Sequence, residues 1–334
     1  MNERDLILET AWPDPLVPME TIRATAPWLK PPYINRLAFA PPRLIDIATL
    51  VTTQENACRF CYGTQHTMMR LSGYSEEQIK DLERDAQLAD GLTREVVNLS
   101  RKLARSTPRP AKAEFEALQR LGLSPKAVAE IVYLVAYTCY CNRLGTFLSL
   151  PPDLKFEQSV RNPIRRFALS MLFRVSPMRT RRVGPSQPVT ADGPLAPLIQ
   201  ALPEAPVAAW FAEQVHASFT APAIPRRTKF LILAVIARTL GCPFCEDAAR
   251  ADLETLGIDH EGSGKILDSL SGPGVTADEA RLLDWARETV RYETGPIQKR
   301  TRALGASVSA GVLLEAVGTA AISNTAARLA MLLE

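Results

Sequence analysis

Apolar residues recur along this chain every three or four positions, which is the spacing of helices that bury one face. Two segments, one starting at Leu44 and one covering 227–240, are predicted to be helices buried inside a bundle. No stretch alternates between apolar and polar residues for long enough to predict a strand. The pattern therefore predicts an all-α protein.

Local signals mark where several helices start. Capping boxes are expected at Ser75 with Gln78 and at Thr276 with Glu279, and a serine followed by Pro125 is typical of a helix start. The other expected helices cover about 58–72, 93–105, 110–121, 124–148 and 210–219.

A motif of two cysteines three positions apart occurs twice. The first dithiol is Cys58 and Cys61, and the second dithiol is Cys242 and Cys245, which lies 184 positions later. Each follows a predicted buried helix, and a glycine stands fifteen positions after its first cysteine. The repeat predicts a tandem duplication.

The last helix of each half carries a matching pair of charged residues, Glu130 with Arg143 and Glu315 with Arg328. The members of a pair are thirteen positions apart, which is too far along a helix for direct contact. Each arginine is therefore expected to bind another carboxylate or a helix end within the bundle.

Length and charge indicate the domain organisation. The 334 residues suit two domains, predicted at 1–150 and 189–334, with a basic linker at 151–188. Within that linker, 164–175 is a short basic amphipathic stretch that could touch an acidic membrane surface or partner. The alternative is a surface helix laid across the two domains.

Composition excludes several classes of protein. A formal net charge of +3 gives no general case for nucleic-acid binding. The chain starts with acidic residues instead of a signal peptide, and its longest apolar runs fall short of the roughly 20 residues that span a bilayer. We therefore expect a cytoplasmic protein with no membrane span.

The cysteine spacing suits redox chemistry. Residues three positions apart on a helix are separated by about 300 degrees, so both sulfurs lie on one face within reach of a disulfide. The helix N-terminus also favours a thiolate. Two alternatives stay open: buried cysteines that serve only as packing, and one zinc site made from all four cysteines. The remaining pair, Cys139 and Cys141, points to opposite sides of a helix and is expected in the core.

The motifs resemble the alkylhydroperoxidase D and carboxymuconolactone decarboxylase superfamily, whose domains are all helical. In that superfamily a glutamate lies twelve residues before a Cys-x-x-Cys, and a histidine follows its second cysteine by four residues. Gly73-Tyr74-Ser75 and Asn142-Arg143 also look like the family's turn and late helix. The resemblance covers about 44–148 and 210–333 and implies two tandem helical-bundle domains of the alkylhydroperoxidase D type.

The resemblance also implies roles for single residues. Asp46 stands where the family has its glutamate, and Gln65 stands where it has its histidine. In such enzymes the histidine and the glutamate deprotonate the second cysteine, so Cys61 would attack and Cys58 would resolve. Gln65, however, cannot take a proton.

Other groups near the first dithiol are candidate bases. His66 follows Gln65 directly, and Glu55 lies just upstream of the cysteines. An ordinary surface or capping role is an equal alternative for His66. Asp46 lies inside an apolar helix, where a carboxylate must be paired, hydrogen-bonded or shifted in pKa.

The second dithiol departs further from the family. Phe230 and Ala249 stand at the glutamate and histidine positions, so no relay serves this pair. Glu246 and Asp247 follow it directly and are expected to raise the pKa of a thiolate by repulsion. The second dithiol is therefore predicted to be less reactive than the first, or structural.

These inferences predict a thiol-dependent peroxidase or disulfide reductase centred on the first dithiol. The resemblance implies no tightly bound cofactor, a hydroperoxide or disulfide substrate, and a lipoyl or thioredoxin-like dithiol donor. It also implies a homo-oligomer. The alternative is a non-redox decarboxylase- or isomerase-like enzyme, or a catalytically silent assembly protein, on the same fold.

Overall fold

The computed structural model describes residues 7–8, 11–29, 37–84, 86–105, 112–175, 193, 195–202, 205–272 and 274–333. Within these ranges every regular element is a helix, which confirms the predicted all-α class. A short helix, α2 (Met19–Thr25), and the 3-10 turn η1 (Pro27–Leu29) precede the first half.

The first half contains the helices that the pattern predicts. Ser75 and Gln78 form the expected capping box, with N–H to oxygen distances of 2.9 and 3.1 Å. The helices are α3 (Pro42–Glu55), α4 (Arg59–Leu71), α5 (Glu76–Arg84), α6 (Gly91–Ala104), α7 (Lys112–Arg120) and α8 (Pro125–Phe147).

The second half follows a similar order. Thr276 and Glu279 form the other expected capping box. One helix begins five residues before its predicted start, because Pro206 is tolerated in a first helical turn. The helices are α12 (Ala196–Ala201), α13 (Ala205–Thr220), α14 (Arg226–Leu240), α15 (Pro243–Thr255), α16 (His260–Ser269), α17 (Ala277–Arg291), α18 (Thr294–Gly305), α19 (Ala310–Leu329) and the 3-10 turn η2 (Ala330–Leu333).

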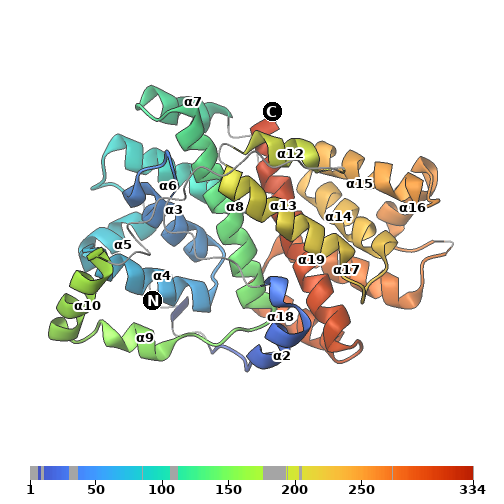
Figure 1. Cartoon of the computed structure of the whole chain (residues 1–334), viewed down its shortest axis with the longest axis horizontal. Helices are drawn as coiled ribbons and strands as arrows, with labels where there is room; N and C mark the ends of the chain where they lie inside the picture. The colour runs from blue at the N-terminus through green and yellow to red at the C-terminus, as the bar shows by residue number, and fades with distance from the viewer. Residues whose placement is uncertain are drawn as a thin grey trace.

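Helices α8 and α19 lie side by side at the middle of the molecule (Figure 1). Their contact is the most extensive between any two described helices. Both are apolar on nearly every side, and almost all of their side chains are buried. Buried apolar side chains of both halves form one continuous core. The buried side chains of the two predicted domains therefore meet in one core.

Two buried glutamates hold the chain just ahead of α3 and of α14. Glu130 on α8 accepts hydrogen bonds from three consecutive backbone N–H groups, those of residues 38 to 40, at 2.6 to 2.8 Å. Glu315 on α19 accepts from the N–H groups of Ala223 and Ile224 at 2.7 and 2.9 Å, and it also pairs with Lys229 at 2.9 Å. Each central helix thus holds the segment that leads into the buried helix of its own half, which is α3 for α8 and α14 for α19.

The two buried arginines behave differently. Arg328 donates to the backbone carbonyls of Leu103, Ala104 and Arg105 at the C-terminal end of α6, at 2.8 to 3.3 Å. The prediction that it binds a helix end is confirmed, and the end belongs to the other half. Arg143 lies over the ring of Tyr292 at 4.6 Å. Burial, together with the positive charge of Arg328, lowers the pKa of Arg143 to about 10.

The basic segment begins with α9 (Leu154–Ser159) and α10 (Pro163–Val175). Both helices pack on α4 of the first half. Glu157 on α9 forms a two-pronged ion pair with Arg59 on α4, at 2.7 and 2.9 Å. The rest of the predicted linker, 176–188, lies outside the described residues.

One stretch, Ala310–Leu333, is long and apolar enough to cross a membrane by length and composition alone. However, 89% of its most apolar window is buried inside the protein, because it contains the central helix α19. Burial of this kind is expected for a core helix.

Candidate functional site

The first dithiol forms at the corner between α3 and α4. Helix α3 ends at Glu55, and Ala57 takes a left-handed conformation with φ of 44° that turns the chain into α4. Cys58 is the N-cap of α4, and its sulfur accepts a hydrogen bond from the backbone N–H of Cys61 at 3.4 Å. The two sulfur atoms are 2.8 Å apart, and both cysteines are free thiols.

The central helix α8 covers this corner closely. A Cβ atom added at Gly145 would lie 2.9 Å from the sulfur of Cys58 and 3.4 Å from that of Cys61. Real Cβ contacts essentially never fall below 3.0 Å, so only a glycine leaves room for the two sulfurs. Cys58 is fully buried, whereas Cys61 is half-buried. Cys61 is therefore the more exposed residue of the pair.

The surroundings separate the pKa values of the two thiols. Burial raises the pKa of Cys58, but hydrogen bonds from Cys61, from Thr146 and from the N–H of Phe60 outweigh burial, so its pKa is lowered. The pKa of Cys61 is raised well above its usual value by burial, by its hydrogen bond to Cys58 and by the charge on Cys58. In the singly ionised pair the charge therefore resides on Cys58, and Cys61 holds the remaining proton.

The second half contributes a side chain to this site. The hydroxyl of Tyr292, at the end of α17, lies 2.7 Å from Oγ1 of Thr146 and 2.8 Å from the backbone carbonyl of Asn142. Thr146 in turn hydrogen-bonds to Cys58. Burial raises the pKa of Tyr292 well above its usual range, so this residue stays protonated and able to donate.

Sequence reasoning missed three of these residues. Gly145 and Thr146 follow the Asn-Arg pair of the family pattern by two and three positions, so the signal lay beside a motif already noted. Tyr292 has no such signal, because only the packing of α17 and α18 against the first half brings it to the dithiol.

Of the predicted proton-handling groups, Asp46 and Gln65 lie together. The side-chain amide of Gln65 donates to the backbone carbonyl of Asp46 at 3.0 Å, which ties α4 to α3. Asp46 is half-buried and engaged in its own interactions. Gln65 therefore has a structural role at the position where the family has a histidine.

His66 and Glu55 lie in other polar clusters. His66 is only 3% exposed, so the expectation of an ordinary surface role is wrong. It lies 3.6 Å from the carboxylate of Glu83, which also accepts a hydrogen bond from Tyr62. Glu55 pairs with Arg101 on α6 at 3.2 Å. Both predicted bases thus have partners that join helices of the first half.

The second dithiol repeats the local geometry of the first. Gly241 takes a left-handed conformation with φ of 65°, Cys242 is the N-cap of α15, and its sulfur accepts from the N–H of Cys245 at 3.4 Å. Both cysteines are buried. The pKa of Cys245 is raised by its hydrogen bond with Cys242 and by burial. The predicted direction of the shift is found, although its main causes are not the neighbouring acids.

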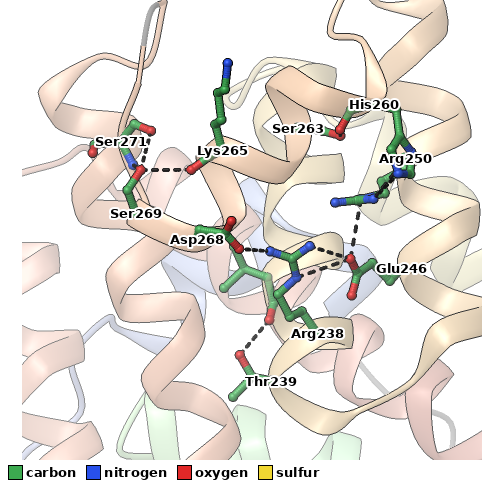
Figure 2. Close-up of polar contacts among 11 residues, drawn as sticks. Arg238, Thr239, Glu246, Arg250, His260, Ser263, Lys265, Asp268, Ser269 and Ser271 are labelled. Carbon is green, nitrogen blue, oxygen red and sulfur yellow. Dashed lines mark hydrogen bonds and ion pairs between the residues drawn. The ribbon is translucent and has the colours of Figure 1, made fainter.

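Figure 2 shows the contacts of Glu246, the acidic residue that directly follows the second dithiol. Glu246 points between Arg238 and Arg250 and pairs with them at 2.8 and 3.4 Å. Arg238 also pairs with Asp268 at 2.5 Å, and Arg250 hydrogen-bonds to His260 at 2.7 Å. The charge of Glu246 is therefore compensated, and the cluster ties α14, α15 and α16 together.

No metal site forms among the residues that the structure describes, since no three His, Cys, Asp or Glu side chains gather to hold an ion there. The four-cysteine zinc alternative is therefore wrong for these residues. Cys139 is buried and accepts a hydrogen bond from Asn56 at 3.4 Å, as expected for a core residue. Burial raises the pKa of Cys141 to about 12, so this thiol is un-ionised at neutral pH.

Comparisons with known proteins leave the family of this chain open: no protein-family model, no curated protein and no solved structure matches it.

Proposed function

We propose that the protein is a thiol oxidoreductase that reduces hydroperoxides or disulfides with the first dithiol. The observation that carries the proposal is the pair of free sulfurs 2.8 Å apart, one on a buried residue with a lowered pKa and the other on a half-buried residue. The tandem arrangement of two alkylhydroperoxidase D-like bundles is part of the proposal. It is supported by the matching corners at Cys58 and Cys242 and by the matching roles of Glu130 and Glu315.

The two sulfurs divide the reaction between them. A proton passes from Cys61 to Cys58, and the Cys61 thiolate then attacks the outer oxygen of a hydroperoxide. The O–O bond breaks, the proton now on Cys58 passes to the leaving alkoxide to give the alcohol, and Cys61 becomes a sulfenic acid. The Cys58 thiolate that remains attacks the Cys61 sulfur and closes the disulfide, and the hydroxide that leaves takes a proton from solvent to become water. A disulfide substrate follows the same course through a mixed disulfide.

A chain of hydroxyls supports the ionisation of Cys58 without a histidine. A tyrosine hydroxyl has one proton, so Tyr292 donates either to the carbonyl of Asn142 or to Thr146. When Cys58 is a thiolate, Thr146 donates to the sulfur and Tyr292 donates to Thr146. When Cys58 is protonated, Tyr292 turns to the carbonyl. The two hydroxyls therefore change their hydrogen bonds with the protonation state of Cys58. Gln65 cannot take part in this way, because its amide takes no proton.

The oxidised pair requires two electrons from outside the chain. A lipoyl or thioredoxin-like dithiol of the cytoplasm would supply them by thiol–disulfide exchange at the sulfur of Cys61. This assignment of donor and compartment follows from the family resemblance and belongs to the proposal.

The test compares Cys58→Ser and Cys61→Ser with the unaltered chain in turnover of an organic hydroperoxide and of a small disulfide, with dihydrolipoamide as donor. We expect both variants to lose turnover, and Cys58→Ser to accumulate a sulfenic acid on Cys61. The matched control, Cys242→Ser with Cys245→Ser, should keep most of the activity. Unchanged turnover in both single variants would falsify the proposal.

A second candidate is a non-redox enzyme or an assembly protein on the same fold. The observation that favours it is Gln65, whose amide is engaged with the carbonyl of Asp46 in place of a base. Gln65→His distinguishes the two. A large gain in peroxidase rate indicates a redox site that the histidine improves, whereas no turnover before or after the change favours the second candidate.

A further inference from the structure

Helix α10 lies at the edge of the molecule, next to α9 and away from the central pair of helices (Figure 1). Four of its large apolar side chains face solvent: Ile164 is 80% exposed, Phe167 70%, Leu172 65% and Met171 50%. Soluble surfaces carry single apolar side chains routinely, but a contiguous group of this size marks an interaction site.

The exposed side chains form one stripe along the helix. With about 100 degrees between successive residues, Phe167 and Met171 lie within about 60 degrees of Ile164 on one side, and Leu172 lies about 80 degrees from Ile164 on the other side. The opposite side of α10 carries Leu169 and Phe173, which are half-buried where the helix packs on α4. The stripe is therefore a second face of the helix, separate from the face that attaches it to the protein.

The charge around the stripe is of one sign. Residues 161–175 include four arginines and no acidic residue, and Arg161, Arg165 and Arg166 are exposed. The two acids of the preceding helix are engaged elsewhere. Glu157 pairs with Arg59, and Asp153 caps α9 by accepting from the N–H of Phe156.

The apolar stripe and the arginines around it together favour an anionic membrane surface over a second copy of the chain. Two copies of the chain that met through this stripe about a twofold axis would bring the arginines of both copies together, and such like-charge contact opposes association. An anionic bilayer instead accepts the apolar side chains below its headgroups and pairs its phosphates and carboxylates with the arginines. At thirteen residues α10 is too short to span a bilayer, which requires roughly 20 residues.

We propose that α10 is a membrane-surface helix that lies in the interface of an anionic bilayer, with Ile164, Phe167, Met171 and Leu172 inserted and the arginines at the headgroups. The helix then holds the protein against the membrane through α4, the helix that starts at the first dithiol.

The test is co-sedimentation of the full chain with vesicles of phosphatidylcholine alone and of phosphatidylcholine with about one-third phosphatidylserine. We expect binding to the anionic vesicles, weaker binding at high salt, and little binding to the neutral ones. Phe167→Ser with Met171→Ser should abolish binding, and Arg165→Gln should weaken it about fivefold at low salt.

Leu88→Ser is the matched control, because Leu88 is an apolar residue that is 75% exposed between α5 and α6, outside α10, and its loss should leave binding unchanged. Thermal melts of all variants confirm that the fold persists. The proposal is wrong if the chain fails to bind anionic vesicles or if the double variant binds like the unaltered chain. It is equally wrong if light scattering shows a dimer that the double variant abolishes while vesicles stay unbound, because the stripe then belongs to a second copy.

Discussion

The two dithiol corners are built alike and surrounded differently. In each corner a buried helix ends, one residue takes a left-handed conformation, and a cysteine caps the next helix by accepting from the N–H of the second cysteine at 3.4 Å. The shared part is local and depends on the Cys-x-x-Cys spacing at a helix start. It places two sulfurs side by side but does not decide whether either one reacts.

The two halves differ at two matching positions near the C-terminal ends of their central helices. Counted from the buried arginine of each, Gly145 and Thr146 on α8 correspond to Ala330 and Met331 after α19. The first corner therefore has space for two sulfurs and a hydroxyl that donates to one of them. The second half has a methyl group and a thioether at the corresponding sequence positions. The space around the first dithiol and the lowered pKa of Cys58 therefore depend on α8 as well as on the Cys-x-x-Cys motif.

The largest expected effect is at the glycine. Gly145→Ala forces a Cβ atom to within 2.9 Å of the Cys58 sulfur, so we expect a loss of about 1–3 kcal/mol of unfolding free energy from overpacking. We also expect slower closure of the first disulfide, because the sulfurs must move. Denaturant unfolding and the rate of disulfide formation measure the two effects. The matched change, Ala330→Gly, should cost less than about 1 kcal/mol and leave disulfide closure unchanged.

Removal of one hydroxyl tests the contribution of the second half to the first dithiol. Tyr292→Phe should destabilise the fold by about 1 kcal/mol and raise the pKa of Cys58 towards its ordinary value. The thiolate absorbance of the first dithiol should then appear at higher pH than in the unaltered chain. Tyr140→Phe is the control, because its hydroxyl binds Gln214 at 3.0 Å. Equal titration curves for the two variants would contradict the hydroxyl chain.

The same lowered pKa makes stability depend on pH. Because folding lowers the pKa of Cys58, the native state loses its proton before the unfolded chain does. The Cys58 thiolate therefore makes its full contribution to the unfolding free energy above the ordinary cysteine pKa of about 8.5. This contribution is lost as pH falls through the pKa that Cys58 has in the folded state. Tyr292→Phe should reduce this contribution.

The smallest effect concerns the left-handed residue before each dithiol. Ala57 has φ of 44°, whereas its counterpart Gly241 has φ of 65° and no side chain to strain. Ala57→Gly should therefore gain about 0.5–1 kcal/mol of unfolding free energy, because relief of the strain exceeds the added chain entropy. Gly241→Ala should lose a similar amount. Thermal melts of the pair of variants measure both, and a loss in Ala57→Gly would contradict the account.

Several predictions from the sequence held because they depend on local rules. The helix over 93–105 was found at Gly91–Ala104, and the capping boxes at Ser75 and Thr276 form as expected. The buried helix at Leu44 was found because its apolar residues leave no polar face.

The sequence by itself determined the helices, the two Cys-x-x-Cys corners and the N-cap position of Cys58, because helix periodicity, caps and the spacing of two cysteines involve neighbours in the chain. Only the tertiary structure decided that His66 is buried with Glu83 and that Tyr292 reaches the first dithiol. It also decided that the two halves share one core. These outcomes depend on which faces of distant helices meet, and residues more than a hundred positions apart carry no local signal of that contact.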